Sequence, residues 1–359
     1  MRLGASPNWL LLFVPVSILL DHSGRASPAM VFFAAALAIV PAARLIVQGT
    51  EHIATRTGAA IGGLLNATFG NLPELIIATV ALRSGLLEMV RASIIGAILA
   101  NLLMALGAAL LIGGVRYHNQ EFNARAARVY SSMMLLAVIS LAGPGAFERV
   151  FSATEHVSQV HALNVRLAVM LMVVYALYLY FMLGTHRDEF AGEAKDGHGH
   201  EQGAAWSMSR AVGTLVGASV LAAWMSEILV GAAEGTGEEL GMSQTFIGMI
   251  IVAVVGGAAE SLSAIAAGAK NKLDLTMGVV YGSCIQIALF VAPVLVLLSR
   301  VIAPEPLDLS FSRVELGVLF LAVLIGGSVG NDGKGNWFKG VQLLTVYATI
   351  ALLLYFVPA

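Results

Sequence analysis

Charged residues are scarce in this sequence. Only 12% of its 359 residues are Asp, Glu, Lys or Arg, whereas 58% are hydrophobic. Soluble domains carry about 25% charged residues, so this composition is that of an integral membrane protein and not of a soluble one. Positive and negative charges nearly cancel, and the formal net charge of −2 by itself indicates no partner. For a membrane protein of this composition we expect no nucleic-acid partner. Cys284 is the only cysteine, which excludes an internal disulfide framework.

Long apolar segments make up most of the chain. A bilayer-spanning helix needs about 20 apolar residues, and we identify eleven candidates: 8–22, 28–48, 59–83, 86–114, 127–145, 163–184, 208–235, 243–269, 273–299, 312–330 and 338–357. The first is short and could belong to a signal peptide. No convincing small-residue cleavage site follows it, so we interpret it as a helix.

One polar stretch, residues 185–206, divides the chain into two halves and is too short for a soluble domain. We therefore predict an all-α integral membrane protein of about eleven transmembrane helices. Its parts are an N-terminal helix (1–27), a first five-helix repeat (28–184), a polar cytoplasmic linker (185–206) and a second, inverted five-helix repeat (207–359).

Two carboxylates lie within apolar segments at matching places in the two halves. Glu74 comes four residues after Gly70, and Glu260 comes four residues after Gly256. Both pairs are offset by 186 positions. A charged side chain at the bilayer centre costs roughly 2.5–3.5 kcal/mol or more, so two matched ones indicate a function.

Further positions match at the same offset, among them Gly96 with Gly282 and Glu88 with Asp274, the latter two as expected helix starts. Five spans separate equivalent points, and because five is odd the second copy must cross the membrane in the opposite direction. Inverted repeats of this kind place a substrate site near the membrane midplane. Lys and Arg residues are more frequent on the side of the membrane that would hold the N-terminus than on the opposite side. This bias predicts a cytoplasmic N-terminus in a cell inner or plasma membrane.

The residues around the two carboxylates are suited to binding a hard cation. Asn71 lies three residues before Glu74 on the same helix face, and Pro73 frees a backbone carbonyl one turn earlier. Carboxylate, amide, hydroxyl and carbonyl oxygens suit Ca²⁺ better than a soft metal. The expected ion-site residues are Gly70, Asn71, Glu74, Gly256, Gly257, Glu260, Ser283 and Gln286.

Structural roles are the alternative interpretation. The two glutamates could pair with an arginine or cap a broken helix, although no basic residue lies within either motif. Asn71 could simply join two helices, and Ser283 could bond to a carbonyl of its own helix. Glu227 could be a second proton-handling group or an interfacial residue.

The same two carboxylates would couple Ca²⁺ to protons. Burial and a neighbouring carboxylate both favour protonation when no metal is bound. Ca²⁺ requires the ionised form, so binding of the metal must release protons. Exclusive occupancy by Ca²⁺ or by protons is the physical basis of an exchanger.

These motifs resemble the cation/proton exchanger family of the calcium/cation antiporter superfamily. Residues 62–74 and 256–260 are similar to its two alpha-repeats, and the likeness runs over roughly residues 45–357, including Gln120-Glu121-Phe122-Asn123 and Asp332-Gly333-Lys334-Gly335-Asn336-Trp337. The resemblance implies eleven helices and Ca²⁺ exchanged for protons. It also implies that Glu74 and Glu260 are the essential ligands, with Asn71, Ser283 and Gln286 nearby.

The chain departs from the family pattern at a few positions. The family usually has Asn where Gly257 stands and His where Ser261 stands, and small polar residues where Ala97 and Ala100 stand. The preferred cation and the coupling ion are therefore left open, with Mn²⁺ and Na⁺ as alternatives.

We expect a secondary active antiporter that exchanges cytoplasmic Ca²⁺ for protons by alternating access, with helices 9–20 and 28–48 as candidates to move. The alternatives are a Na⁺/Ca²⁺ or Mn²⁺ exchanger and, more distantly, a passive cation channel. No metalloprotease or Ser/His constellation indicates an enzyme, and no cofactor is expected beyond the transported Ca²⁺ and H⁺. The lipid bilayer is the expected surrounding, and a homo-oligomer is left open.

Overall fold

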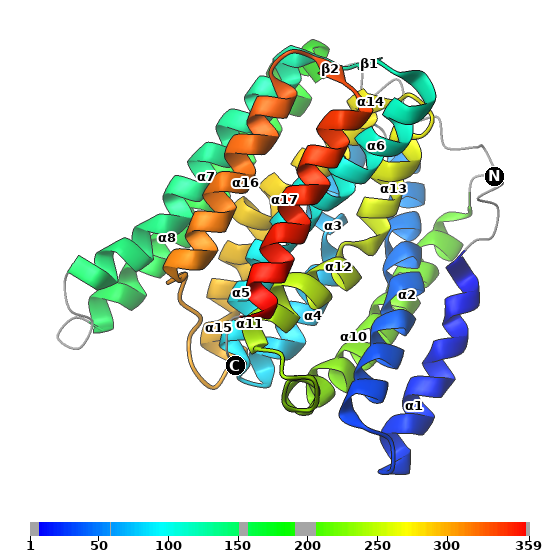
Figure 1. Cartoon of the computed structure of the whole chain (residues 1–359), viewed down its shortest axis with the longest axis vertical. Coiled ribbons are helices and arrows are strands. Elements are labelled where there is room, and N and C mark those ends of the chain that lie inside the picture. The colour runs from blue at the N-terminus through cyan, green and yellow to red at the C-terminus, as the bar shows by residue number, and fades with distance from the viewer. Residues whose placement is uncertain (1–6, 58, 151–156, 191–205, 357–359) are drawn as a thin grey trace.

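The protein is a bundle of long helices that run alternately up and down (Figure 1). The computed structural model describes residues 7–57, 59–150, 157–190 and 206–356. Within these ranges, eight helices are long and apolar enough to cross a membrane, and one bent helix pair would bring the number to nine. The predicted all-α membrane fold is confirmed, whereas the count of eleven spans stays a prediction.

The first half of the chain contains two helices that pack side by side at one edge, followed by a broken helix, a long central helix and an outer pair. The elements are η1 (Pro7–Leu12), α1 (Phe13–Ser23), α2 (Pro28–Thr57), α3 (Ala59–Phe69), α4 (Leu72–Arg83), α5 (Leu87–Leu99), the π-helical turn η2 (Ala100–Ala105), α6 (Leu106–Tyr117), β1 (Gln120–Glu121), α7 (Ala124–Val150), α8 (Val157–Tyr180), the π-helical turn η3 (Phe181–Thr185) and η4 (Arg187–Phe190).

The second half repeats this order from a long helix onward. The elements are α10 (Met208–Leu240), α11 (Gln244–Phe246), the π-helical turn η5 (Ile247–Val252), α12 (Ala253–Gly256), α13 (Ala258–Gly268), α14 (Leu273–Gln286), the π-helical turn η6 (Ile287–Val291), α15 (Ala292–Ile302), α16 (Arg313–Gly330), β2 (Lys334–Gly335) and α17 (Trp337–Tyr355). Most of the predicted linker, residues 191–205, lies outside the described residues. The repeat boundaries remain predictions.

Helix α5 and the turn η5 cross at the centre with their backbones almost in contact. A Cβ atom on Gly96 would collide with the carbonyl group of Met249, and one on Gly248 would lie 2.5 Å from the carbonyl oxygen of Met89. A Cβ contact this short does not occur without movement of the neighbouring backbone. Glycine is therefore required on both sides of this crossing. The crossing joins the two halves of the chain next to the broken helices.

One end of the bundle is closed by bonds between the halves. The two-residue strands β1 and β2 pair in an antiparallel manner, and the buried Gln120 side chain donates from Nε2 to the Gly268 carbonyl at 2.9 Å. The backbone N–H of Asn123 donates to Asp274 Oδ1 at 2.6 Å. The polar motif at residues 120–123 thus joins the end of α6 and the start of α7 to α13 and α14. Figure 1 shows this end at the top.

Lys339 fastens the turn between α16 and α17 at the same end. Its Nζ donates to Asp332 Oδ1 and Oδ2 at 2.7 and 2.8 Å, to the Lys334 carbonyl at 2.7 Å and to the Val329 carbonyl at 3.2 Å. Slight burial raises the pKa of Asp332, but the hydrogen bonds from Lys339 and from the Lys334 N–H outweigh it, so that pKa is lowered overall.

Substitution Gly96→Ala should lower the melting temperature of the purified protein strongly, because its Cβ has no space against Met249. The matched position in the second half provides the control. Nothing lies within 4 Å of a Cβ on Gly282, so Gly282→Ala should be neutral or slightly stabilising. Equal melting temperatures for the two variants would contradict the close crossing.

Substitution Asp332→Asn should destabilise the protein at neutral pH by about 0.2–1 kcal/mol, as expected for a largely exposed ion pair. A lowered pKa means that the ionised carboxylate stabilises the fold above the ordinary carboxyl pKa, and that this contribution is lost as pH falls through the folded pKa. Melting curves of wild type and variant should therefore differ near pH 7 and converge in acid. If the difference in melting temperature between wild type and Asp332→Asn grew on acidification, the ionised Asp332 carboxylate would not be the stabilising form.

Candidate ion-binding site

Both motif helices are broken at the same place relative to their carboxylates. The first break separates α3 from α4 at Gly70 and Asn71, and Pro73 takes the second position of α4, where its missing N–H costs nothing. In the second half, α11–α12 and α13 meet at Gly257 with a bend of 60°. Glu74 and Glu260 each occupy the third position of the half-helix that follows. Acidic groups there are favoured by the helix dipole.

Glu74 and Glu260 are almost completely removed from the surface, with 9% and 8% of their areas exposed. None of their four carboxylate oxygens has a hydrogen-bond partner among the described residues. The two side chains lie close enough for the charge on Glu74 to act on Glu260. Two buried carboxyl groups without a protein donor are stable only if a cation or a proton neutralises them.

Two glycines of the second motif bring its break against Glu74. A Cβ atom on Gly256 would lie 3.1 Å from Glu74 Cγ, and one on Gly257 would lie 3.5 Å from Glu74 Oε1. A side chain at Gly256 would press on the Cγ of Glu74, which belongs to the opposite half, and the Glu74 side chain would have to shift by a few tenths of an ångström. Because Gly256 and Gly257 have no side chains, the Glu74 side chain has space beside the second break.

A chain of hydrogen bonds links three buried polar residues from different helices beside this pair. Asn101 Nδ2 donates to Ser283 Oγ at 3.0 Å, and Ser283 Oγ donates to Asn71 Oδ1 at 2.6 Å. Asn71 precedes α4 but makes no side-chain capping bond to it. Its Nδ2 has no partner among the described residues. These two hydrogen bonds fix the orientation of the Asn71 side chain at the first break.

Gln286 reaches the same break from α14. Its Nε2 donates to the carbonyl oxygen of Thr68 at 3.2 Å, and its Oε1 faces Gly70, at 3.3 Å from the place of a Cβ there. In an unbroken helix the Thr68 carbonyl would accept from the N–H of residue 72. The side chain of one half thus supplies the hydrogen bond that the broken helix of the other half has lost.

Comparison with known families identifies the chain. The family model described as "Sodium/calcium exchanger protein" matches residues 27–184 and 210–356. The chain belongs to this family. Among curated exchangers, it is 40% identical to a "Ca(2+)/H(+) antiporter" of Aphanothece halophytica, covering 97% of this chain and 96% of that protein. It is 39% identical to "Ca(2+)/H(+) antiporter ChaA" of Bacillus subtilis, covering 90% and 92%.

A solved structure extends the likeness to three dimensions. The structure of native YfkE matches with a TM-score of 0.83 and 35% identity, covering 98% of this chain and 99% of that one. The predicted resemblance to Ca²⁺/H⁺ exchangers is confirmed at the level of the family and the fold.

All eight predicted site residues lie at or beside the two breaks of this exchanger fold. Ser283 bonds to Asn71 and not to its own helix, and neither glutamate pairs with an arginine among the described residues. The structure does not test their roles as ligands, which remain predictions. Glu227 is exposed on α10.

Asn101 was missed by the sequence analysis. Its side chain is 1% exposed and its amide lies 4.0 Å from the place of a Cβ on Gly257. An asparagine inside the apolar segment 86–114 is a signal that could have been followed, because polar residues in a span are rarely neutral. Ser261 also contributes a buried hydroxyl without a partner among the described residues.

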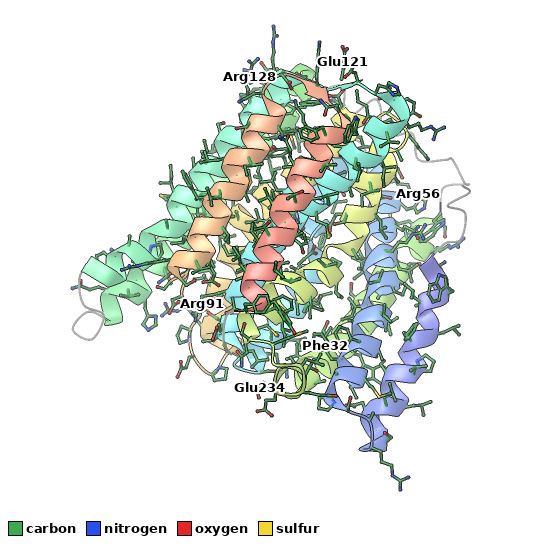
Figure 2. All side chains as sticks on the ribbon, viewed as in Figure 1. Phe32, Arg56, Arg91, Glu121, Arg128 and Glu234 are labelled. Carbon is green, nitrogen blue, oxygen red and sulfur yellow. The ribbon has the colours of Figure 1, made fainter. Side chains whose placement is uncertain are left out.

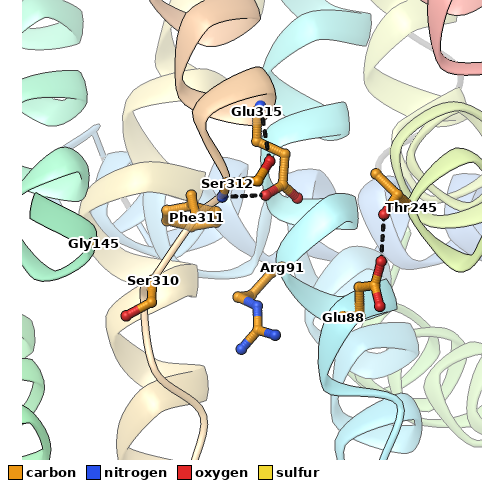
Figure 3. A pocket seen from close by; sticks show the side chains of 8 residues that line it. All are labelled: Glu88, Arg91, Gly145, Thr245, Ser310, Phe311, Ser312 and Glu315. Carbon is orange, nitrogen blue, oxygen red and sulfur yellow. Dashed lines mark hydrogen bonds between the residues drawn. The ribbon is translucent and has the colours of Figure 1, made fainter. Parts of the chain in front are cut away.

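A separate cavity of about 260 Å³ lies at the end of the bundle opposite the β1–β2 pair. Glu88, Arg91, Thr245 and Glu315 contribute to its lining (Figure 3). Glu88 accepts from Thr245 Oγ1 at 2.6 Å, and Arg91 pairs with Asp308 at 2.8 Å. Glu88 and Asp274 both lie in first turns of helices, as predicted. This cavity contains neither Glu74 nor Glu260.

The residues at the breaks have the charge and the oxygen types that a divalent cation requires, although they do not form a conventional metal centre. No group of three or more His, Cys, Asp or Glu side chains placed to hold a metal occurs in residues 7–57, 59–150, 157–190 and 206–356. Two carboxylates match the charge of one divalent cation, and amide, hydroxyl and backbone oxygens complete a hard ligand set. A set with few charges suits an ion that must be released again.

Substitution Ser283→Ala should lower the free energy of unfolding by about 1–3 kcal/mol, because it leaves two buried amides without their shared partner. Ser226→Ala is the control. Ser226 is equally buried, but its hydroxyl donates only to the Ala222 carbonyl of its own helix at 2.6 Å. Thermal unfolding in detergent should separate the two variants. A loss from Ser226→Ala as large as that from Ser283→Ala would contradict a special role for the Asn71–Ser283–Asn101 chain.

Proposed function

We propose that this protein is a secondary active antiporter that exchanges Ca²⁺ for protons at a site formed by Glu74 and Glu260. The observation that carries the proposal is the pair of buried carboxylates, one from each half, whose oxygens have no hydrogen-bond partner among the described residues. The two relatives named as Ca²⁺/H⁺ antiporters support the choice of ions.

The cation would be held by both carboxylates, with oxygens of Asn71 and Gln286 and the hydroxyl of Ser283 within the same group. Asn71 and Gln286 are each fixed by one hydrogen bond, to Ser283 and to the Thr68 carbonyl respectively. Ligands that are already oriented lose less entropy when the ion binds. Carboxylates and amide oxygens also favour Ca²⁺ over softer metals.

Protons would be the counter-substrate because they compete for the same oxygens. Ca²⁺ binds only to ionised carboxylates, so its arrival expels any proton held there. When the cation leaves, the two carboxylates remain buried and close to each other, and protonation relieves both the burial and the repulsion. Ca²⁺ and protons therefore cannot occupy the pair together, which is the requirement for coupled exchange.

Alternating access would come from movement of α2 and α10 past the broken helices. These two helices form the most extensive helix pair among the described residues, and both also contact α4. The buried face of α2 is rich in alanine, including Ala34, Ala35, Ala38 and Ala42. Small side chains give a smooth surface along which helices can approach closely and shift. The sequence suggested α1 with α2, and the contacts add α10 to this group.

Sodium-coupled exchange is the second candidate, because the matching family is described by sodium/calcium exchange. A passive channel would not need competition between the two ions. Uphill Ca²⁺ accumulation would exclude the channel, and dependence on a Na⁺ gradient without a pH gradient would favour the second candidate.

The decisive experiment is Ca²⁺ uptake into proteoliposomes driven by an imposed pH gradient. Glu74→Gln and Glu260→Gln should each reduce uptake to the level of protein-free liposomes, because one remaining carboxylate cannot neutralise the cation. Glu121→Gln, which removes an exposed acid on β1, should transport like wild type.

Two results would overturn the proposal. Full activity of either glutamine variant would remove the two-carboxylate site. Uptake by wild type that ignores the pH gradient but follows Na⁺ would keep the site and reject proton coupling.

A further inference from the structure

A second cavity lies at the end of the bundle that carries β1 and β2. It has a volume of about 510 Å³ and is lined by Asn123, Ala124, Arg125, Arg128 and Glu189. These residues come from the start of α7 and from η4, which is joined to α7 where Asn123 Nδ2 donates to the Glu189 carbonyl at 2.6 Å. Figure 2 shows Arg128 at this end, far from Arg91 at the other.

Both arginines of this cavity are exposed, and no ion pair involving either occurs among the described residues. They are three residues apart on α7, so their side chains are neighbours on one helix face and repel each other. They also lie in the first two turns of α7, where positive charge opposes the helix dipole. Two guanidinium groups and the carboxylate of Glu189 leave the cavity with one net positive charge. A singly charged anion is the ligand that this arrangement would stabilise.

The exposed face of α7 that carries the two arginines becomes apolar further along the helix. At helical spacing Arg125 and Arg128 are followed by Ser132, Leu136 and Ile139, and all of these are exposed. Leu136 and Ile139 are 37% and 70% exposed and lie well within Ala124–Phe147, a helix long and apolar enough to cross a membrane. We call the exposed residues Arg125, Arg128, Ser132, Leu136 and Ile139 the α7 stripe. A ligand that contacts the whole stripe must have an anionic headgroup beside the arginines and a long apolar chain beside Leu136 and Ile139.

From this stripe we infer that the start of α7 binds an anionic phospholipid, with its phosphodiester between Arg125 and Arg128 and its acyl chains along Leu136 and Ile139. Arginine binds phosphate oxygens through paired N–H groups, which a single ammonium cannot match. Basic pockets at the membrane boundary are suited to acidic lipid headgroups. The site is independent of the Glu74–Glu260 pair.

The test is native mass spectrometry of the purified full chain titrated with phosphatidylglycerol or with phosphatidylcholine. Arg125→Gln/Arg128→Gln should bind phosphatidylglycerol roughly tenfold to thirtyfold more weakly than wild type. Arg116→Gln/Lys334→Gln removes two exposed positive charges from the same end, outside the cavity, and should bind as wild type does. Arg125→Lys/Arg128→Lys should be intermediate, and the single glutamine variants should each show part of the loss.

Four outcomes would overturn the inference. The first is unchanged phosphatidylglycerol binding by the double glutamine variant, and the second is an equal loss in the Arg116/Lys334 control. The third is displacement of the lipid by inorganic phosphate, which would assign the site to a soluble phosphate. Equal binding of phosphatidylcholine by wild type would likewise reject recognition of the headgroup charge.

Discussion

Burial of an ionised carboxylate without a partner costs several kcal/mol, and this chain buries two carboxyl groups, Glu74 and Glu260, whose oxygens have no hydrogen-bond partner among the described residues. The surrounding structure is arranged around that cost. The helix breaks place each carboxylate in the first turn of a half-helix, where the dipole favours negative charge. Gly256 and Gly257 leave space beside Glu74, and no basic side chain in the described part of the chain bonds to either carboxyl group. In the proposed function, a cation or a proton supplies the neutralisation.

The amides and hydroxyls near the breaks solve a second problem, which is the loss of helical hydrogen bonds in an apolar environment. A backbone carbonyl left without a donor inside a membrane is costly. Gln286 satisfies the carbonyl of Thr68, while Ser283 and Asn101 orient Asn71. The groups proposed to bind the cation are thus the same groups that keep the broken helix stable. A substitution that alters the proposed cation site at these positions would therefore also alter the stability of the fold.

Much of this arrangement could be predicted from the sequence because its signals are strong. Carboxylates in apolar segments and glycines at a fixed offset locate the residues of the candidate site. The breaks themselves were not expected, because segments 59–83 and 243–269 each read as one continuous span, whereas the helices are interrupted at Gly70–Asn71 and at Gly257. Asn101 could not be found from that offset, since Ile287 stands at the matching position. Its place beside Ser283 depends on how two helices cross, and that packing leaves no periodic trace in the sequence. Gly96 is tightly enclosed whereas Gly282 has open space around it, and this difference likewise could not be predicted from the sequence.

Two of the π-helical turns interrupt the central helices of the two halves at similar depths. The turn η2 begins at Ala100 and η6 at Ile287, nearly the same distance into equivalent helices of the two halves. A π turn holds one more residue than the α turn it replaces and is frequent at functional sites. One additional residue rotates everything that follows by about 100° relative to an uninterrupted α-helix. Each of these two helices therefore presents a different face after the turn than before it, so its two parts can contact different neighbours without a kink.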